Sequence, residues 1–225
     1  MADKLFKYSK YVYRIPIVVI LVLWCVYIVE IKFGFNFNKY GIYPQKISGL
    51  KGILFSPFIH SDIKHLFNNS MPILVLLPAL YYFYYKIANK IIFYGILLTG
   101  FLTWSFGRPA FHIGASGMIY LLVSFIFFSG VFRKYYRLVA LSLIVVFLYG
   151  SMVWYIFPME DRISWEGHLS GFLVGLLFAF IFKTRGPTPN KFEYSKNEEF
   201  ESLFDNDGNF APPEKIEDLE KGTDD

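Results

Sequence analysis

Long apolar runs occupy most of the first 185 residues and constrain the fold more than any other feature. A helix needs roughly 20 apolar residues to cross the hydrocarbon core of a bilayer, and six runs approach that length. They cover approximately residues 15–31, 66–85, 91–107, 115–132, 138–157 and 167–183. Charged residues make up 18% of the chain, whereas a soluble domain carries about 25%. We therefore predict an all-α membrane protein with a bundle of six transmembrane helices.

Basic residues are distributed unevenly between the loops that connect these spans. With the N-terminus in the cytoplasm, the cytoplasmic segments before residue 186 carry eleven lysines and arginines, and the outer segments carry seven. An excess of positive charge marks the cytoplasmic side of membrane helices, so we expect both termini inside. The first apolar run has no cleavage site of small residues, and we interpret it as a retained helix. The expected location is a bacterial cytoplasmic (inner) membrane.

Composition changes at about residue 186, where glycine and prolines end the sixth span. The residues that follow include twelve acidic residues and four lysines, a net charge of −8, whereas the complete chain carries +4. Because this tail has few apolar residues to bury, we expect it to be disordered. A docking segment is the alternative, formed by Phe200, Leu203, Phe204 and Phe210. The predicted parts are a cytoplasmic N-terminus, a six-helix domain and an acidic cytoplasmic tail, at residues 1–14, 15–185 and 186–225.

Two aromatic segments each allow two interpretations. The first loop, residues 32–55, mixes lysines with phenylalanines and tyrosines and is too interrupted to span a membrane. This mixture fits a segment lying in the outer membrane interface, and an ordinary external loop fits equally well. Near the end of the fifth span, bulky side chains suit either a lateral gate for a substrate or an interfacial belt. They are Met152, Trp154, Tyr155 and Phe157.

Four polar residues open three of the spans. Ser116 begins the fourth span, and His168 begins the sixth. His65 and Asn69 begin the second, one helical turn apart and therefore on one face. Because the even-numbered spans all run inward from the outer face, the four groups lie at the same side of the membrane. Polar groups near membrane depth are expensive and indicate a function by default.

These residue types suit serine chemistry. A serine hydroxyl is a weak nucleophile that needs a neighbouring base to take its proton, and histidine is a suitable base. The negatively charged oxygen that forms during acyl transfer needs hydrogen-bond donors. The Asn69 amide, the His65 ring and the start of the Ser116 helix are candidate donors. Glycines at every fourth position of the sixth span allow another helix to approach closely; they are Gly167, Gly171 and Gly175.

The arrangement of these residues resembles that of the rhomboid family of intramembrane serine proteases. The similar motifs are His60-x4-His65-x3-Asn69, Gly114-x-Ser116-Gly117 and Gly167-His168-x2-Gly171-x3-Gly175. They occur in the family's order on the second, fourth and sixth spans, and the resemblance covers roughly residues 15–183. Some family members carry a Trp-Arg pair in the first loop. This chain lacks the pair, so the resemblance does not imply a fold for that loop.

The resemblance implies a role for each matched residue. Ser116 is expected to be the nucleophile and His168 the general base of a Ser–His dyad that has no third carboxylate. His65 and Asn69 match the positions that stabilise the oxyanion. The supporting positions, which include a tyrosine that packs on the catalytic histidine in the family, are His60, Gly114, Gly117, Tyr120, Gly167 and Gly171.

The same resemblance implies an endopeptidase that cleaves transmembrane segments of other membrane proteins near the outer membrane face. Its expected partners are single-pass membrane proteins and the lipid bilayer, with no nucleic acid, metal or organic cofactor. The alternative is a non-catalytic rhomboid-like protein that binds membrane helices without cutting them. Such relatives usually lack the serine or the histidine, and this chain has both. The sequence identifies neither the substrate nor the oligomeric state.

Other polar features have plainer interpretations. Glu166 lies two residues before His168, a spacing that does not face it on a helix, so we interpret it as an acid favoured by the helix dipole. His112 is interpreted as a loop histidine without a role. His60 and His65 are five residues apart, which does not match a zinc-binding pair on a helix. Polar groups gather at one membrane face rather than through the depth of the bundle, which disfavours a transporter or channel.

Overall fold

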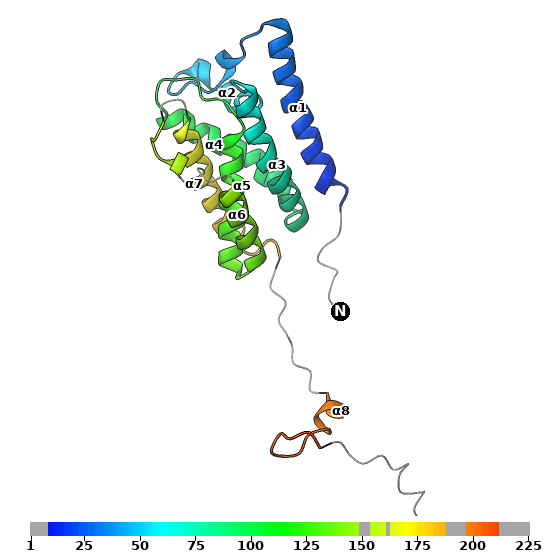
Figure 1. The fold of residues 1–225 in the computed structure, drawn as a ribbon. Helices are drawn as coiled ribbons and strands as arrows, with labels where there is room; N and C mark the ends of the chain where they lie inside the picture. The colour runs from blue at the N-terminus through cyan, green and yellow to red at the C-terminus, as the bar shows by residue number, and fades with distance from the viewer. Residues whose placement is uncertain (1–8, 149–153, 161–162, 188–196, 212–225) are drawn as a thin grey trace, which may run out of the picture. The chain divides into compact units, whose positions relative to one another are not determined.

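The computed structural model describes residues 9–148, 154–160, 163–187 and 197–211 of the 225-residue chain. The chain divides into two compact units, Met1–Pro189 and Asn190–Asp225. Among the described residues, β structure is limited to two isolated bridges, which confirms the predicted all-α class. The helices of the first unit (Figure 1) are α1 (Tyr11–Phe33), α2 (Gly52–Phe55), α3 (Ile63–Phe83), α4 (Ala88–Phe106), α5 (Ser116–Arg133), α6 (Tyr136–Leu148) and α7 (Trp165–Ile181).

Each of the six apolar runs contains a helix at the predicted place, and most bounds shift by only a few residues. The fifth run differs, because Leu148 ends the described part of α6 and residues 149–153, including Met152, lie outside the described residues. A short 3-10 helix, η4 (Trp154–Ile156), follows. Among the helices of the described residues, α1, α3 and α5 are long and apolar enough to cross a membrane, and α6 and α7 are apolar but shorter.

Side-chain caps fix where two of the helices begin. The Asp62 carboxylate accepts a hydrogen bond from the backbone N–H of His65 at 2.8 Å, so α3 begins at Ile63, before its apolar run. The Ser164 hydroxyl caps α7 in the same way by accepting from the N–H of Gly167. As a result, the two helices start just before the histidines that the sequence analysis singled out.

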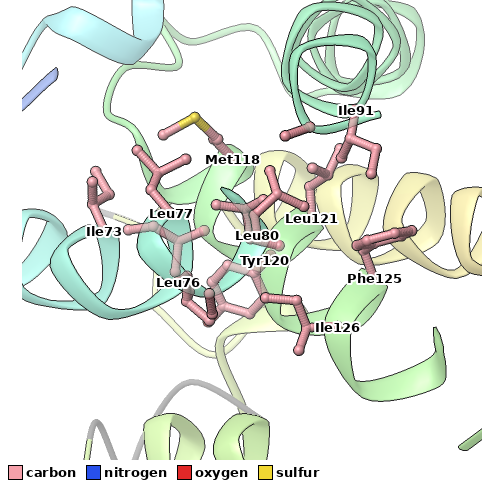
Figure 2. Packing of buried hydrophobic residues seen from close by; sticks show 14 of the residues in the cluster. Ile73, Leu76, Leu77, Leu80, Ile91, Met118, Tyr120, Leu121, Phe125 and Ile126 are labelled. Atoms are coloured by element: carbon pink, nitrogen blue, oxygen red, sulfur yellow. The ribbon is translucent and has the colours of Figure 1, made fainter. Parts of the chain in front are cut away.

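Helix α5 lies at the centre of the bundle. It contacts α7 along most of its length, and it also contacts α3, α4 and α6, whereas α1 packs mainly on α3. Figure 2 shows how side chains of α3, such as Leu77 and Leu80, meet Met118 and Leu121 of α5 in the buried core. Inside a bilayer such packing, rather than exclusion from water, holds helices together. The core therefore fixes α5 relative to its neighbours.

The first loop folds onto the connection between α4 and α5. Backbone hydrogen bonds join Ile42 and His112 in both directions, at 2.9 and 2.8 Å, and the N–H of Gly114 donates to the carbonyl of Ser56 at 2.8 Å. The loop contains α2 and two 3-10 turns, η1 (Asn38–Tyr40) and η2 (Ile47–Gly49), and a third turn, η3 (Ser56–Phe58), follows it. Its position relative to the membrane interface stays a prediction.

In the second unit, the described residues 197–211 form a short local structure, and the expected disorder of the tail stays a prediction. They contain α8 (Glu198–Glu201) and an isolated bridge between Phe204 and Phe210. The Asp205 carboxylate accepts hydrogen bonds from two backbone N–H groups of the intervening turn, and the two phenylalanine rings lie 5.7 Å apart. These contacts all join residues only a few positions apart. The rest of the tail from residue 188 lies outside the described residues.

Candidate functional site

The structure brings Ser116 and His168 together at the start of α5 and α7. The distance between Ser116 Oγ and His168 Nε2 is 2.8 Å, which is a hydrogen bond between residues 52 positions apart. His168 is buried, with 6% of its surface exposed. The predicted serine and histidine therefore meet with the geometry that a nucleophile and its base require.

The other side of the His168 ring is held by a group that the sequence analysis did not assign to the site. Nδ1 lies 2.9 Å from the backbone carbonyl of Tyr155. A carbonyl only accepts hydrogen bonds, so Nδ1 carries the proton, and Nε2 is free to accept from the Ser116 hydroxyl. The Tyr120 ring stacks on the imidazole at 4.3 Å, with 14° between the planes. The ring is thus fixed in both its orientation and its tautomer.

Close packing of α5 and α7 makes this hydrogen bond possible. A Cβ atom at Gly171 would lie 2.1 Å from the carbonyl oxygen of Gly117, so no other residue fits there without moving one of the helices. Gly117 also faces α7. A Cβ atom at Gly117 would lie 3.3 Å from the carbonyl oxygen of Gly167. The predicted glycine face therefore lies in the contact between the two helices.

Gly114 brings the start of α3 next to the residues that precede Ser116. It has a φ of +104°, which side-chain-bearing residues rarely adopt. A Cβ at this position would lie 2.6 Å from His65 Nε2 and 3.4 Å from Asn69 Nδ2. Asn69 is 5% exposed, and its Nδ2 has no hydrogen-bond partner among the described residues. An amide donor thus lies buried and unused near the serine.

His65 and Asn69 differ in how ready they are to donate. The Ser61 hydroxyl donates its proton to Asp62 at 2.8 Å, and Ser61 Oγ lies 3.2 Å from His65 Nδ1. With its proton used, Ser61 accepts from Nδ1–H of the histidine. In this tautomer Nε2, the nitrogen that faces Gly114, is an acceptor. Asn69 is therefore the readier donor of the two predicted oxyanion residues.

His60, the predicted supporting residue, packs edge-on against His65 with 4.9 Å between the ring centroids. It is 2% exposed. Burial lowers the pKa of His60 to about 4, and the neighbouring His65 acts in the same direction. The pKa of the Asp62 carboxyl is also lowered, because the His65 N–H and the Ser61 hydroxyl donate hydrogen bonds to it. At neutral pH this corner of the site contains a neutral ring and an ionised cap.

A small cavity of about 40 Å³ lies beside Ser116. The first loop, α4 and the start of α5 form its walls, with apolar side chains, threonine and glycine at the surface. The residues that line it include Ile53, Ile96, Thr99, Gly100 and Met118. The cavity lies next to the serine hydroxyl and is a candidate pocket for a substrate side chain.

Two residues that the sequence analysis set aside lie beside this site. Glu166 is fully buried and accepts a hydrogen bond from the backbone N–H of Arg108 at 3.1 Å, in addition to its place in the first turn of α7. His112 is also buried, with 4% of its surface exposed, and bonds to Ser164. Both contacts join segments more than 50 residues apart, and no local spacing signals them. Across the described ranges, no group of three or more histidine, cysteine or acidic side chains is placed to hold a metal ion.

The sequence of the chain is similar to a known protein family and to proteins of two mycobacteria. Residues 48–185 match the family model described as the rhomboid domain. An uncharacterized protein of Mycobacterium tuberculosis is 32% identical over 176 residues, covering 72% of this chain and 71% of the relative. An uncharacterized protein of Mycobacterium leprae is 34% identical over 157 residues, covering 65% of this chain and 61% of the relative. The family match and the apolar helices indicate a multi-pass membrane protein, and we conclude that the chain belongs to the rhomboid family.

Proposed function

We propose that this protein is an intramembrane serine endopeptidase that cleaves transmembrane segments of other membrane proteins through a Ser116–His168 dyad. The observation that carries the proposal is the 2.8 Å contact between Ser116 Oγ and His168 Nε2, in a ring whose Nδ1 donates to the Tyr155 carbonyl. The family supports it, since rhomboid proteins are generally intramembrane serine proteases.

The geometry supports a two-step acyl transfer. His168 Nε2 takes the Ser116 proton as Oγ attacks the scissile carbonyl, and the protonated ring then gives that proton to the leaving amine. The Asn69 amide and the N–H groups at the start of α5 are the proposed donors to the oxyanion. In the second step, the neutral ring takes a proton from the water that attacks the acyl-serine ester, and it gives that proton to Ser116 Oγ as the ester bond breaks and the carboxylic acid leaves.

The proposed orientation places this site at the outer membrane face, with both termini in the cytoplasm of a bacterial cell. The excess of basic residues in the segments expected inside supports this orientation. The proposed substrates are single-pass membrane proteins, whose helices reach the site from the bilayer. Labelling of intact cells with a membrane-impermeant thiol reagent tests the orientation. A cysteine introduced into the first loop is expected to react, and one introduced into the turn between α5 and α6 is expected to stay unlabelled.

The cavity beside Ser116 supports a preference for small residues at the cut. Ile53, Ile96 and Thr99 line this small space, and we expect them to leave room for an alanine side chain but to clash with a phenylalanine. We expect a single-pass substrate with alanine before the cut bond to be cleaved at least tenfold faster than its phenylalanine variant, because a misfit at the reacting carbonyl is costly. Product masses from the two substrates measure the preference, and equal rates would contradict it.

A cleavage assay on a panel of single-pass helices tests the proposed activity directly. Wild-type protein in liposomes is expected to release fragments of defined mass, and Ser116→Ala is expected to release none. A fluorophosphonate probe should label the wild type but neither Ser116→Ala nor His168→Ala. A correctly folded wild type that neither cleaves nor reacts would instead favour the non-catalytic alternative, a protein that binds membrane helices.

A further inference from the structure

A second polar cluster joins the segment that leads to Ser116 to the helix that carries His168. Glu166 Oε1 accepts from the Arg108 backbone N–H at 3.1 Å and lies 3.6 Å from Arg108 Nε. Arg108 Nη2 also donates to the carbonyl of Ile163 at 2.5 Å. Arg108 lies two residues after the end of α4, and Ile163 and Glu166 flank the start of α7. One arginine and one glutamate thus tie these two parts of the chain together.

His112 makes a second link between the same two parts. Its Nε2 lies 3.1 Å from the Arg108 carbonyl, which only accepts, so Nε2 carries the proton. Nδ1 then accepts from the hydroxyl of Ser164, 2.6 Å away. That hydroxyl also caps α7 by accepting from the N–H of Gly167. The His112 ring is therefore bonded to the residue that fixes where α7 begins.

The backbone of His112 is held from the opposite direction by the first loop. Its N–H and carbonyl both pair with Ile42, at 2.8 and 2.9 Å. Residue 112 therefore has its main chain on the first loop and its side chain on α7. It lies four residues before Ser116, so both attachments restrict where the serine can lie.

The chemistry of the cluster indicates a role in position more than in stability. Glu166 is fully buried, and its Oε2 has no hydrogen-bond partner among the described residues, although His112 Nδ1 lies 3.9 Å away. A buried carboxylate whose desolvation is only partly offset is an inefficient way to hold helices together, because apolar packing does so at lower cost. Hydrogen bonds of fixed direction instead restrict distance and angle.

We propose that Arg108, His112 and Glu166 are positioning residues that set the distance between Ser116 and His168. The dyad comes from two separate segments, and a displacement of about 1 Å between reacting groups costs on the order of a hundredfold in rate. The cluster links these segments next to the dyad. This inference rests on the proposed function, because the distance matters for rate only if the dyad is catalytic.

The test compares Glu166→Ala with a matched variant, Ser124→Ala. Ser124 Oγ donates to the carbonyl of Phe172 at 2.7 Å, so it also links α5 to α7, but deeper in the bundle. For Glu166→Ala we expect kcat for a single-pass substrate to fall about ten- to a hundredfold with KM unchanged. The two variants are expected to lower Tm by similar amounts, but kcat of Ser124→Ala stays at the wild-type level. Glu166→Gln should restore most of kcat, because its amide oxygen still accepts from the Arg108 N–H.

A spectroscopic measurement separates this inference from the proposed activity. The ¹⁵N signal of His168 Nε2 reports whether the Ser116 hydroxyl donates to it, with Ser116→Ala as the reference for a lost bond. In Glu166→Ala the signal is expected to move toward that reference, and this holds even for a protein that cleaves nothing. His112→Gln is the second variant if Glu166→Ala does not fold. Wild-type signals and wild-type kcat in folded variants would overturn the inference and leave the proposed function intact.

Discussion

Helices α5 and α7 have a buried polar cluster at each end, and the two clusters use their hydrogen bonds differently. At the far end, Ser129 bonds to the Tyr84 hydroxyl at 2.7 Å and to Arg133 Nε at 3.0 Å. Arg133 also donates to the carbonyls of Phe182 and Arg185, which follow α7. At the near end, where α5 and α7 begin, six buried polar atoms have no partner among the described residues: Asn69 Nδ2, Thr99 Oγ1, Glu166 Oε2, Ser170 Oγ and both ring nitrogens of His60.

This difference distinguishes a structural cluster from a candidate site. A buried polar group without a partner lowers the free energy of unfolding. At the far end the named polar groups are paired, as expected of a cluster that stabilises the fold. The unpaired polar groups at the near end destabilise the folded protein, and folding alone does not require them. Asn69 Nδ2 is an unused donor near the serine, and a developing negative charge needs such a donor. Substitutions at the two ends test this division.

The largest expected difference is between two serines of the same helix. Ser116→Ala is expected to abolish cleavage, at least a thousandfold, with little change in Tm because among the described residues the hydroxyl bonds only to His168. Ser129→Ala is expected to lower the free energy of unfolding by about 1–3 kcal/mol, because it leaves the Tyr84 hydroxyl and Arg133 Nε without their partner. Its folded fraction should cleave at the wild-type rate. Loss of kcat in folded Ser129→Ala would break the comparison.

Asn69 provides the next largest effect. Asn69→Ala is expected to lower kcat about a hundredfold, the typical cost of losing one oxyanion donor, with a small effect on Tm since the amide nitrogen bonds to nothing among the described residues. His65→Gln is expected to cost less, because the hydrogen bonds of Ser61 assign the proton of His65 to Nδ1 and leave Nε2, which faces Gly114, as an acceptor. Single-turnover cleavage rates measure both. A larger loss for His65→Gln would show that its ring is the principal donor.

The contact between the two helices sharpens the comparison further. Gly171→Ala places a methyl group 2.1 Å from the Gly117 carbonyl, so α5 and α7 must separate, at a cost of about 1–3 kcal/mol. We expect both Tm and kcat to fall, since the dyad spans the same contact. Gly95→Ala is the control, because its methyl group meets only the movable end of the Leu121 side chain. This control should lose stability without a change in kcat.

The smallest expected effect concerns pH. Burial lowers the pKa of His60 to about 4 in the folded protein, whereas histidine in an unfolded chain titrates near 6.5. Between these values only the unfolded chain binds the proton, so the free energy of unfolding decreases as pH falls from about 6.5 to about 4. Above pH 6.5, His60 contributes no pH dependence to the free energy of unfolding. The Tm profile of His60→Gln should be flatter in this window, and parallel profiles would contradict the assignment.

The sequence predicts the helices and the identity of the near-end residues better than it predicts how they are held. Apolar runs locate the helices because each run must bury itself in lipid or against a neighbour. The polar positions at the starts of α3, α5 and α7 stand out for the same reason. The carbonyl of Tyr155 and the pairing of Arg108 with Glu166 leave no periodic signal, because they depend on how irregular loops fold across the bundle.

The order of the helices along the chain has a consequence for synthesis of the protein. Ser116 lies on α5 and Asn69 on α3, but His168 lies on α7, the last helix of the bundle. A nascent chain that has not reached residue 168 holds the proposed nucleophile and oxyanion donor without a base. The proposed dyad forms only when the final helix has entered the membrane and packed against α5. A chain that is released before residue 168 therefore lacks the proposed dyad.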